Sequence, residues 1–196
     1  YVTDNTIDTI SSSSVLDTQE LFLECHTVTG SGLDQQFTFL AQTVTLNGQN
    51  KVTLPTPVAR VSRVYNNNGI ELFGVVNVYE DTAIVGGVPS DVTKIHDQIP
   101  LGFQQSFKGA TTFSNEDYYI LTAGFGSVTY KQSAAVNFYL EFRQDGKVFR
   151  EGAAVSANSA GGAWQINLDP AIVIQKNSDV RITCQSNTQG AEVYAS

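Results

Sequence analysis

An Asp-Gly pair at positions 145 and 146 stands between two apolar runs, and it constrains the fold more than any other feature of the chain. Every second residue before it is apolar over four positions: Val136, Phe138, Leu140 and Phe142. This is the two-residue period of a strand with one buried face. Asp tolerates and Gly freely adopts the positive φ that both central residues of a type I′ turn need. The sequence therefore predicts a β-hairpin over residues 136–151.

The residues that flank the pair also predict the register of this hairpin. With a two-residue loop, Phe142 lies opposite Phe149 and Glu141 lies opposite Arg150. Such pairing puts two aromatic rings together on the inner face and an ion pair on the outer face, and both stabilise a hairpin.

Short alternating segments and turn signals follow one another along the rest of the chain. Asn47-Gly48, the Asn66–Gly69 run and Asn177–Asp179 are rich in residues that favour tight turns. A spacing of roughly eight to twelve residues between turns is typical of sandwiches and jelly rolls. No segment shows a convincing helical period. We predict an all-β chain, an antiparallel β-sandwich that is jelly-roll-like, with two tandem β domains as a further possibility.

The chain divides into three parts by composition. Residues 1–20 are polar and Ser-rich, and we interpret them as an N-terminal arm or a weak edge strand. Residues 21–97 are expected to form a smaller β-sandwich or barrel domain. Residues 98–196 are expected to form a jelly-roll-like β-sandwich, with the single Trp164 facing its core.

The charge balance excludes several classes of partner. The chain has 19 acidic and 11 basic residues and a net charge of −8, whereas binding to phosphates requires clustered Lys and Arg. We therefore expect no nucleic-acid partner and no anionic membrane surface. A run of about twenty apolar residues, as a membrane helix requires, is missing. The chain also has no Met and no secretory signal, and we expect its natural start to lie upstream.

Two cysteines and two histidines are the residues most often used in nucleophilic catalysis. Cys25 and Cys184 each continue an apolar alternation, which favours two buried thiols over a disulfide. His26 directly follows Cys25, so the two side chains point to opposite faces of a strand and cannot act together. We interpret His96-Asp97 as a surface pair, because no further ligand or triad partner is near in sequence.

Other candidate motifs lack the context that their chemistry needs. Neither Glu80-Asp81 nor Glu116-Asp117 selects the two acids that flank a glycosidic bond, and Glu141 is assigned to Arg150. The oxygen-rich stretches 66–68 and 115–117 lack the spacing of a calcium loop. No helix follows the Gly pairs at 124–126 and 161–162, which we interpret as turns. We predict no catalytic, cofactor-binding or metal-binding residue, no cofactor and no enzymatic activity.

The tyrosines offer an aromatic surface that leaves three interpretations open. The six considered are Tyr65, Tyr79, Tyr118, Tyr119, Tyr130 and Tyr139. Tyr139 is predicted to point outward from the hairpin. Such a residue fits simple strand propensity, a platform for glycans, or a subunit interface.

Several strand segments resemble those of β-rich structural proteins of tailed bacteriophages, especially phages of marine hosts. The segments are VTLNG at 44–48, VARVSRVY at 58–65, FGVVNVYED at 73–81, YYILTAGFGSV at 118–128, FYLEFRQDGKVFRE at 138–151 and IVIQKNSDVRI at 172–182. The resemblance implies a role at the phage head, as a capsid decoration or cement protein or a head fibre. It transfers no catalytic residue.

These observations together predict a non-enzymatic virion structural protein, assembled in the cytoplasm of the host bacterium. We expect a symmetric homo-oligomer, preferably a homotrimer, that binds the major capsid protein or another virion protein through its N-terminal region and one sandwich edge. The alternative is a carbohydrate-binding or host-receptor-binding β-sandwich, as in a phage tail fibre or a secreted adhesin. A glycosidase or other hydrolase ranks last.

Overall fold

The computed structural model describes residues 4–31, 34–108, 110–114, 118–128, 135–144, 148–158 and 162–186. Within these ranges the regular structure is almost entirely strand, apart from short 3-10 segments such as η2 (Val92–Lys94), and every strand pairing is antiparallel. The predicted all-β class is therefore confirmed. The described residues fall into two compact units: unit 1 takes in those up to Lys108 apart from Asp34, and unit 2 those from Ala110 onwards.

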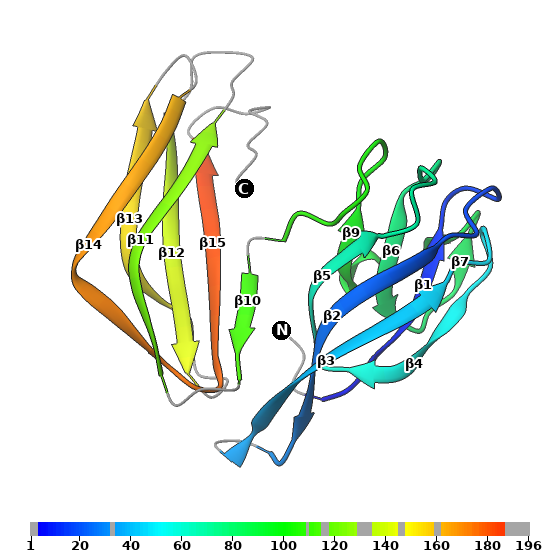
Figure 1. The fold of residues 1–196 in the computed structure, drawn as a ribbon, viewed down its shortest axis with the longest axis horizontal. Helices are drawn as coiled ribbons and strands as arrows, with labels where there is room; N and C mark the ends of the chain where they lie inside the picture. Colours follow the sequence, from blue (N-terminus) through cyan, green and yellow to red (C-terminus); the bar gives the residue numbers. More distant parts are fainter. Residues whose placement is uncertain are drawn as a thin grey trace. The chain divides into compact units, whose positions relative to one another are not determined.

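Unit 1 consists of two sheets that face each other and a small hairpin (Figure 1). The four-stranded sheet has the order β4 (Val52–Val58), β1 (Ile7–Ser12), β6 (Val76–Glu80) and β9 (Ile95–Ile99). The three-stranded sheet has the order β3 (Gln36–Thr45), β2 (Glu20–Thr29) and β5 (Arg60–Asn66). The hairpin pairs β7 (Ile84–Val85) with β8 (Val88–Pro89).

One hydrophobic core lies between the two sheets of unit 1. Ile10 of β1 and Val76 of β6 enter it from one sheet, and Leu23 of β2 and Val64 of β5 enter it from the other, all fully buried. Side chains from both sheets thus share one cluster, which is the arrangement of a β-sandwich.

The N-terminal residues are a central part of this sandwich. β1 lies between β4 and β6, and Ile7 and Ile10 are 1% and 0% exposed. The prediction of an arm or a weak edge strand is therefore wrong for residues 7–12. Its Ser and Thr residues suggested solvent, but Ser11 and Ser12 are buried and their hydroxyls are hydrogen-bonded within unit 1.

The boundary between the units differs from the predicted one at 97/98. Asp97 lies inside β9, opposite Val78 of β6, so a division there would cut a strand of the four-stranded sheet. The chain continues to belong to unit 1 after β9, because Gln105 bridges to Tyr65 and Ser106 N donates to Val64 O at 2.7 Å. Residues 104–108 extend the edge of β5 and complete unit 1.

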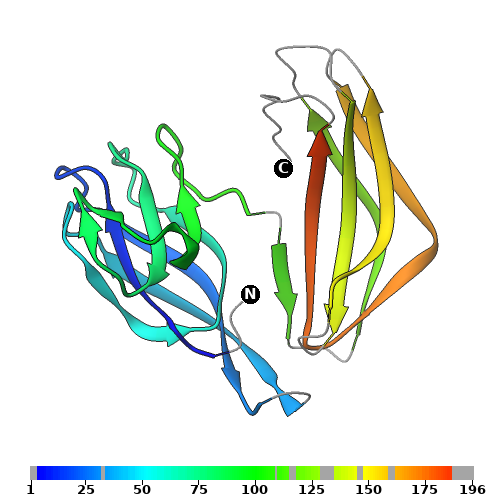
Figure 2. The ribbon, with the colours of Figure 1, turned by 180° about the vertical axis from the view of Figure 1, so that it is seen from behind.

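Unit 2 contains a four-stranded and a two-stranded sheet, which Figure 2 shows from behind. The larger sheet has the order β10 (Ala110–Phe113), β15 (Ser178–Ser186), β12 (Ala135–Gln144) and β13 (Arg150–Asn158). The smaller one pairs β11 (Tyr118–Val128) with β14 (Gly162–Gln175). Val136 and Phe138 of β12 are buried with Ile174 and Val180. The jelly-roll connectivity stays a prediction.

The strands of the predicted hairpin do pair, as β12 and β13, but their register is different. Phe142 lies opposite Arg150 and Glu141 opposite Glu151, so the predicted partners Phe149 and Arg150 are wrong. The register shifts between Leu140 and Glu141, where Gly152 is skipped. A Cβ on Gly152 would lie 2.7 Å from Phe142 Cε1, so a larger residue at the bulge would force the Phe142 ring to shift.

Two further predictions fall outside what the structure describes. The Asp145-Gly146 turn lies in an undescribed range, and so does the side chain of Trp164.

Candidate functional site

A buried carboxylate joins two loops at one end of unit 1. Asp17, in the 13–19 loop between β1 and β2, is 0% exposed. Its Oδ1 accepts from Phe73 N at 2.7 Å, and its Oδ2 accepts from Gly74 N at 3.0 Å and from the Ser12 hydroxyl. Phe73 and Gly74 belong to the 67–75 loop between β5 and β6. One side chain therefore fixes the distance between the two loops.

A third segment, residues 100–107, is tied to the 67–75 loop in the same way. Asn66 N donates to Gln104 O at 2.7 Å, and Gln104 Oε1 accepts from Asn66 Nδ2 at 2.8 Å and from Leu72 N at 3.3 Å. The views in Figures 1 and 2 agree that the three connections lie at the same end of unit 1. They form a single hydrogen-bonded group.

Large apolar side chains project into solvent from these three segments. They are Val15, Leu16, Ile70, Phe73, Leu101, Phe103 and Phe107, with exposed fractions between 41 and 66%. We call this set the loop-end surface. Single exposed apolar residues are common on proteins, but a group on adjacent loops marks an interaction site. The loop-end surface is therefore the strongest candidate functional site in the described residues.

Sequence reasoning missed this site because its organising residue looks ordinary. Asp17 follows a Ser run and precedes Thr18, a composition typical of a solvated loop. The apolar residues of the loop-end surface are spread over three segments far apart in the sequence. Only the pairing of strands brings those segments together.

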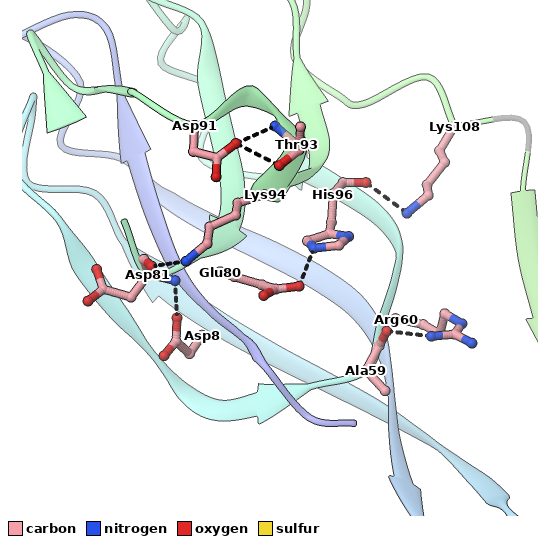
Figure 3. A network of polar contacts seen from close by, with 10 residues as sticks. All are labelled: Asp8, Ala59, Arg60, Glu80, Asp81, Asp91, Thr93, Lys94, His96 and Lys108. Atoms are coloured by element: carbon pink, nitrogen blue, oxygen red, sulfur yellow. Dashed lines mark hydrogen bonds and ion pairs between the residues drawn. The ribbon is translucent and has the colours of Figure 1, made fainter. Parts of the chain in front are cut away.

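Only one member of the predicted surface pair His96-Asp97 is buried. Asp97 is 7% exposed and accepts from the Ser106 hydroxyl at 2.9 Å and from Gln98 N at 2.9 Å. His96 is half-buried, and its Nε2 lies 2.9 Å from Glu80 Oε1 (Figure 3). Burial raises the pKa of Asp97 and lowers the pKa of His96 from their usual values. Both residues belong to the strand β9.

His96 should make the stability of the protein sensitive to mild acid. Its folded-state pKa is lowered below the ordinary 6.5, so the unfolded chain takes up a proton first as the pH falls. The contribution of His96 to the free energy of unfolding is thus complete above pH 6.5, and it is lost as the pH falls from 6.5 to the lowered folded-state pKa. In urea unfolding over this pH range, the free energy of unfolding of His96→Gln should fall less than that of the natural chain. Identical pH profiles for the two proteins would contradict this assignment.

The other histidine is also covered. His26 on β2 is 4% exposed; its Nδ1 lies 3.4 Å from the Ser62 hydroxyl, and its ring packs edge-on against Phe39 at 5.6 Å. The described contacts give it a packing role within the three-stranded sheet.

The two cysteines are both free, which confirms that they form no disulfide. Cys25 is buried in the core as predicted, and burial raises its pKa to about 12. Cys184 is exposed, so its predicted burial is wrong. It lies near the end of β15, the last described strand.

These environments predict different reactivities of the two thiols. Only the thiolate reacts with disulfide reagents. With Ellman's reagent, the folded protein should therefore release about one thionitrobenzoate per chain, from the reaction of Cys184. In denaturant, where both thiols are accessible, it should release about two. Cys184→Ser should abolish the signal of the folded protein, and a signal that disappears instead in Cys25→Ser would refute the assignment.

The acidic pairs are dispersed by the fold. Glu80 contacts His96, whereas its neighbour Asp81 forms an ion pair with Lys51 at 2.6 Å. Glu141 accepts from Arg181 Nε and from the Thr183 hydroxyl, both at 2.9 Å, in place of the predicted Arg150. Residues 115–117 lie outside the described ranges.

The structure places most of the glycine pairs and oxygen-rich stretches in strands or in a local turn. Residues 124–126 belong to β11, so the predicted turn there is wrong; Gly161 is not described, and Gly162 begins β14. Asn66 ends β5, and its side chain accepts from Asn68 N at 3.1 Å in a local turn.

Across the described ranges, no three His, Cys, Asp or Glu side chains gather as a metal site would require. A helix long and apolar enough to span a bilayer is not found in the part of the chain that the structure describes.

Of the tyrosines, Tyr139 keeps the orientation that was predicted. Its neighbours Val136 and Phe138 on β12 are buried, whereas Tyr139 is half-buried and its hydroxyl donates to Gln185 Oε1 at 3.4 Å. Tyr79 is fully buried in unit 1, and its hydroxyl lies within hydrogen-bond distance, 3.0 Å, of the Ser11 hydroxyl.

The chain shows no match to any family model, to any curated protein or to any solved structure in comparisons with all three.

Proposed function

We propose that the protein is a non-enzymatic structural protein of a tailed-bacteriophage virion, a capsid decoration, cement or head-fibre protein. The loop-end surface is the observation that carries this proposal. Its apolar side chains would be removed from water by docking onto another protein, at a gain of roughly 25 cal/mol for each Å² buried.

The rigidity of the loop-end surface supports docking onto a preformed lattice. Association costs less when the binding loops are already ordered. Here Asp17 and Gln104 hold the three segments together through hydrogen bonds within the chain, which form without a binding partner. The surface is thus prepared for a fixed protein target such as a major capsid protein.

Repetition of the surface in a symmetric homo-oligomer, with a trimer favoured, would add binding strength. Several weak contacts to one lattice act together once the first has formed. The net charge of −8 would also keep the protein away from the packaged genome during assembly in the bacterial cytoplasm. The segments that resemble phage structural proteins point to the same setting, the virion.

A charge placed on the loop-end surface tests the proposal. Phe73→Asp and Leu16→Asp should each weaken co-sedimentation with undecorated phage heads by about tenfold or more, because a buried carboxylate without a partner is costly. Val92→Asp is the matched control, since Val92 is 71% exposed but lies on η2. Equal binding by all three variants would overturn the role of this surface.

A polar sheet face favours a second candidate, a carbohydrate-binding or receptor-binding module. Around Tyr139, Asn137 Oδ1 accepts from the Ser156 hydroxyl at 2.7 Å, and Gln185 accepts from Tyr139. An aromatic ring among amides and hydroxyls on neighbouring strands is suited to a sugar ring. Binding on a glycan array that is lost in Tyr139→Ala would establish this candidate, and a silent array would remove it.

A further inference from the structure

The chain contains two Asn-Gly pairs, Asn47-Gly48 and Asn68-Gly69, and both lie in loops of unit 1. Asparagine is a thermolabile residue. It is most labile before glycine, because a residue without a Cβ leaves its backbone nitrogen open to the side chain of the residue before it. The sequence alone gives the two pairs the same reactivity, but the structure places them in opposite environments.

The Asn47-Gly48 pair is covered by the neighbouring loop. Gly48 is buried, and its N–H donates to Asp17 O at 2.7 Å. A Cβ on Gly48 would lie 2.8 Å from Val15 O, so the backbone of that loop packs directly against the glycine. Asn47 is held as well, because it forms a β-bridge with Asn50. The backbone nitrogen of Gly48 is therefore both engaged and shielded.

The Asn68-Gly69 pair is open to solvent. Both residues are exposed, and a Cβ on Gly69 would meet no atom within 4 Å. Among the described residues, Gly69 N has no acceptor and the Asn68 side chain has no hydrogen-bond partner. Asn66 holds the turn itself: its Oδ1 accepts from Asn68 N at 3.1 Å, and its Nδ2 donates to Ile70 O at 2.6 Å. Water and base can therefore reach both reacting groups.

From this contrast we infer that Asn68 is a site of spontaneous deamidation, whereas the fold protects Asn47. Gly69 N loses its proton to base and attacks Asn68 Cγ. A new N–C bond forms, the bond from Cγ to Nδ2 breaks, and the leaving nitrogen takes a proton from water and departs as ammonia. Water then opens the resulting five-membered succinimide at either carbonyl, which leaves aspartate or isoaspartate at position 68. No atom is oxidised or reduced.

The modification changes the charge of the loop-end surface. Position 68 lies in the same loop as Ile70 and Phe73, whose side chains are exposed members of that surface. A carboxylate replaces a neutral amide there, and a carboxylate that a docked protein covers must lose its water at a considerable cost. On the proposed function, which this step requires, ageing of the unbound protein should therefore weaken its docking onto the phage head.

Peptide mapping by mass spectrometry tests the site on the full chain. The folded protein is incubated in mildly alkaline buffer, and the gain in mass from the exchange of NH₂ for OH is followed in the peptides that contain the two pairs. Asn68 should be modified about tenfold faster than Asn47 or more, because Gly48 must first break its hydrogen bond. In urea the two rates should become equal. Equal rates in the folded protein, or faster modification of Asn47, would overturn the inference.

Two neighbouring asparagines give a matched pair of variants. Asn68→Gln should abolish the fast modification, because the longer side chain would have to close a less favoured six-membered ring. Asn67→Gln should leave it unchanged, since Asn67 is also exposed but precedes an asparagine rather than a glycine. Labelling by an isoaspartyl methyltransferase, which methylates isoaspartate and leaves ordinary aspartate unmodified, gives a second readout. Fast modification that persists in Asn68→Gln would refute the assignment.

Co-sedimentation of fresh and aged protein with undecorated phage heads tests the effect on docking. Aged protein and Asn68→Asp should bind about threefold more weakly than fresh protein and Asn68→Gln, or weaker still. Equal binding of fresh and aged protein would overturn the effect on docking. Fresh protein that does not bind heads would count against the proposed function and the effect on docking together, whereas the mass spectra decide the modification separately.

Discussion

Replacing Asp17 with alanine should lower the free energy of unfolding by about 3–5 kcal/mol. The carboxylate accepts three hydrogen bonds in a fully buried position, from two backbone N–H groups and the Ser12 hydroxyl. Alanine leaves these donors buried without an acceptor, and each loses the water that it has in the unfolded chain. Urea unfolding followed by circular dichroism measures the change.

Asp91→Ala provides the control for this prediction. Asp91 also accepts from a backbone N–H and a hydroxyl, both of Thr93, but it is not buried and lies at the start of η2. Its replacement should lower the free energy of unfolding far less than that of Asp17, because water can take over the hydrogen bonds of the cap. Comparable losses in Asp17→Ala and Asp91→Ala would show that the buried network does not hold the loops.

Gly87→Ala should have an effect of similar size, about 3–5 kcal/mol, through steric conflict. Gly87 has φ +78°, and a Cβ there would lie 1.8 Å from Ser12 O. That oxygen belongs to the backbone of β1, so it cannot rotate away as a side chain would. The hairpin β7–β8 would have to leave β1, breaking the bond from the Ser11 hydroxyl to Gly87 O at 2.8 Å.

Gly69→Ala separates this conflict from the cost of the backbone angle. Gly69 has φ +70°, but a Cβ there would meet no atom within 4 Å. Only the conformational cost of about 1–2 kcal/mol should remain. If Gly87→Ala were no more destabilising than Gly69→Ala in the same urea assay, the close approach of the hairpin to β1 would be refuted.

The all-β class followed from the sequence because strand alternation and turn chemistry are local properties. The strand β12 was predicted from its alternating period, and the start of its partner β13 from the Asp145-Gly146 turn signal that precedes it. Their register was not, because the bulge at Gly152 depends on how close the Phe142 ring comes from the neighbouring strand. Nothing in the local sequence encodes that contact.

The candidate site was hidden for a related reason. Composition cannot distinguish a solvated Ser-rich segment from one whose hydroxyls are paired in the interior, as those of Ser11 and Ser12 are. The same limit applies to Asp97, whose partner Ser106 lies beyond the next turn. Buried polar residues are recognised only once their partners are known.

Co-sedimentation of the purified natural protein with undecorated phage heads, after its mass has been measured by light scattering, tests the proposed role most directly. A symmetric oligomer, with a trimer favoured, that pellets with the heads is the predicted result. A monomer that stays in the supernatant at every protein concentration would contradict the role in capsid decoration.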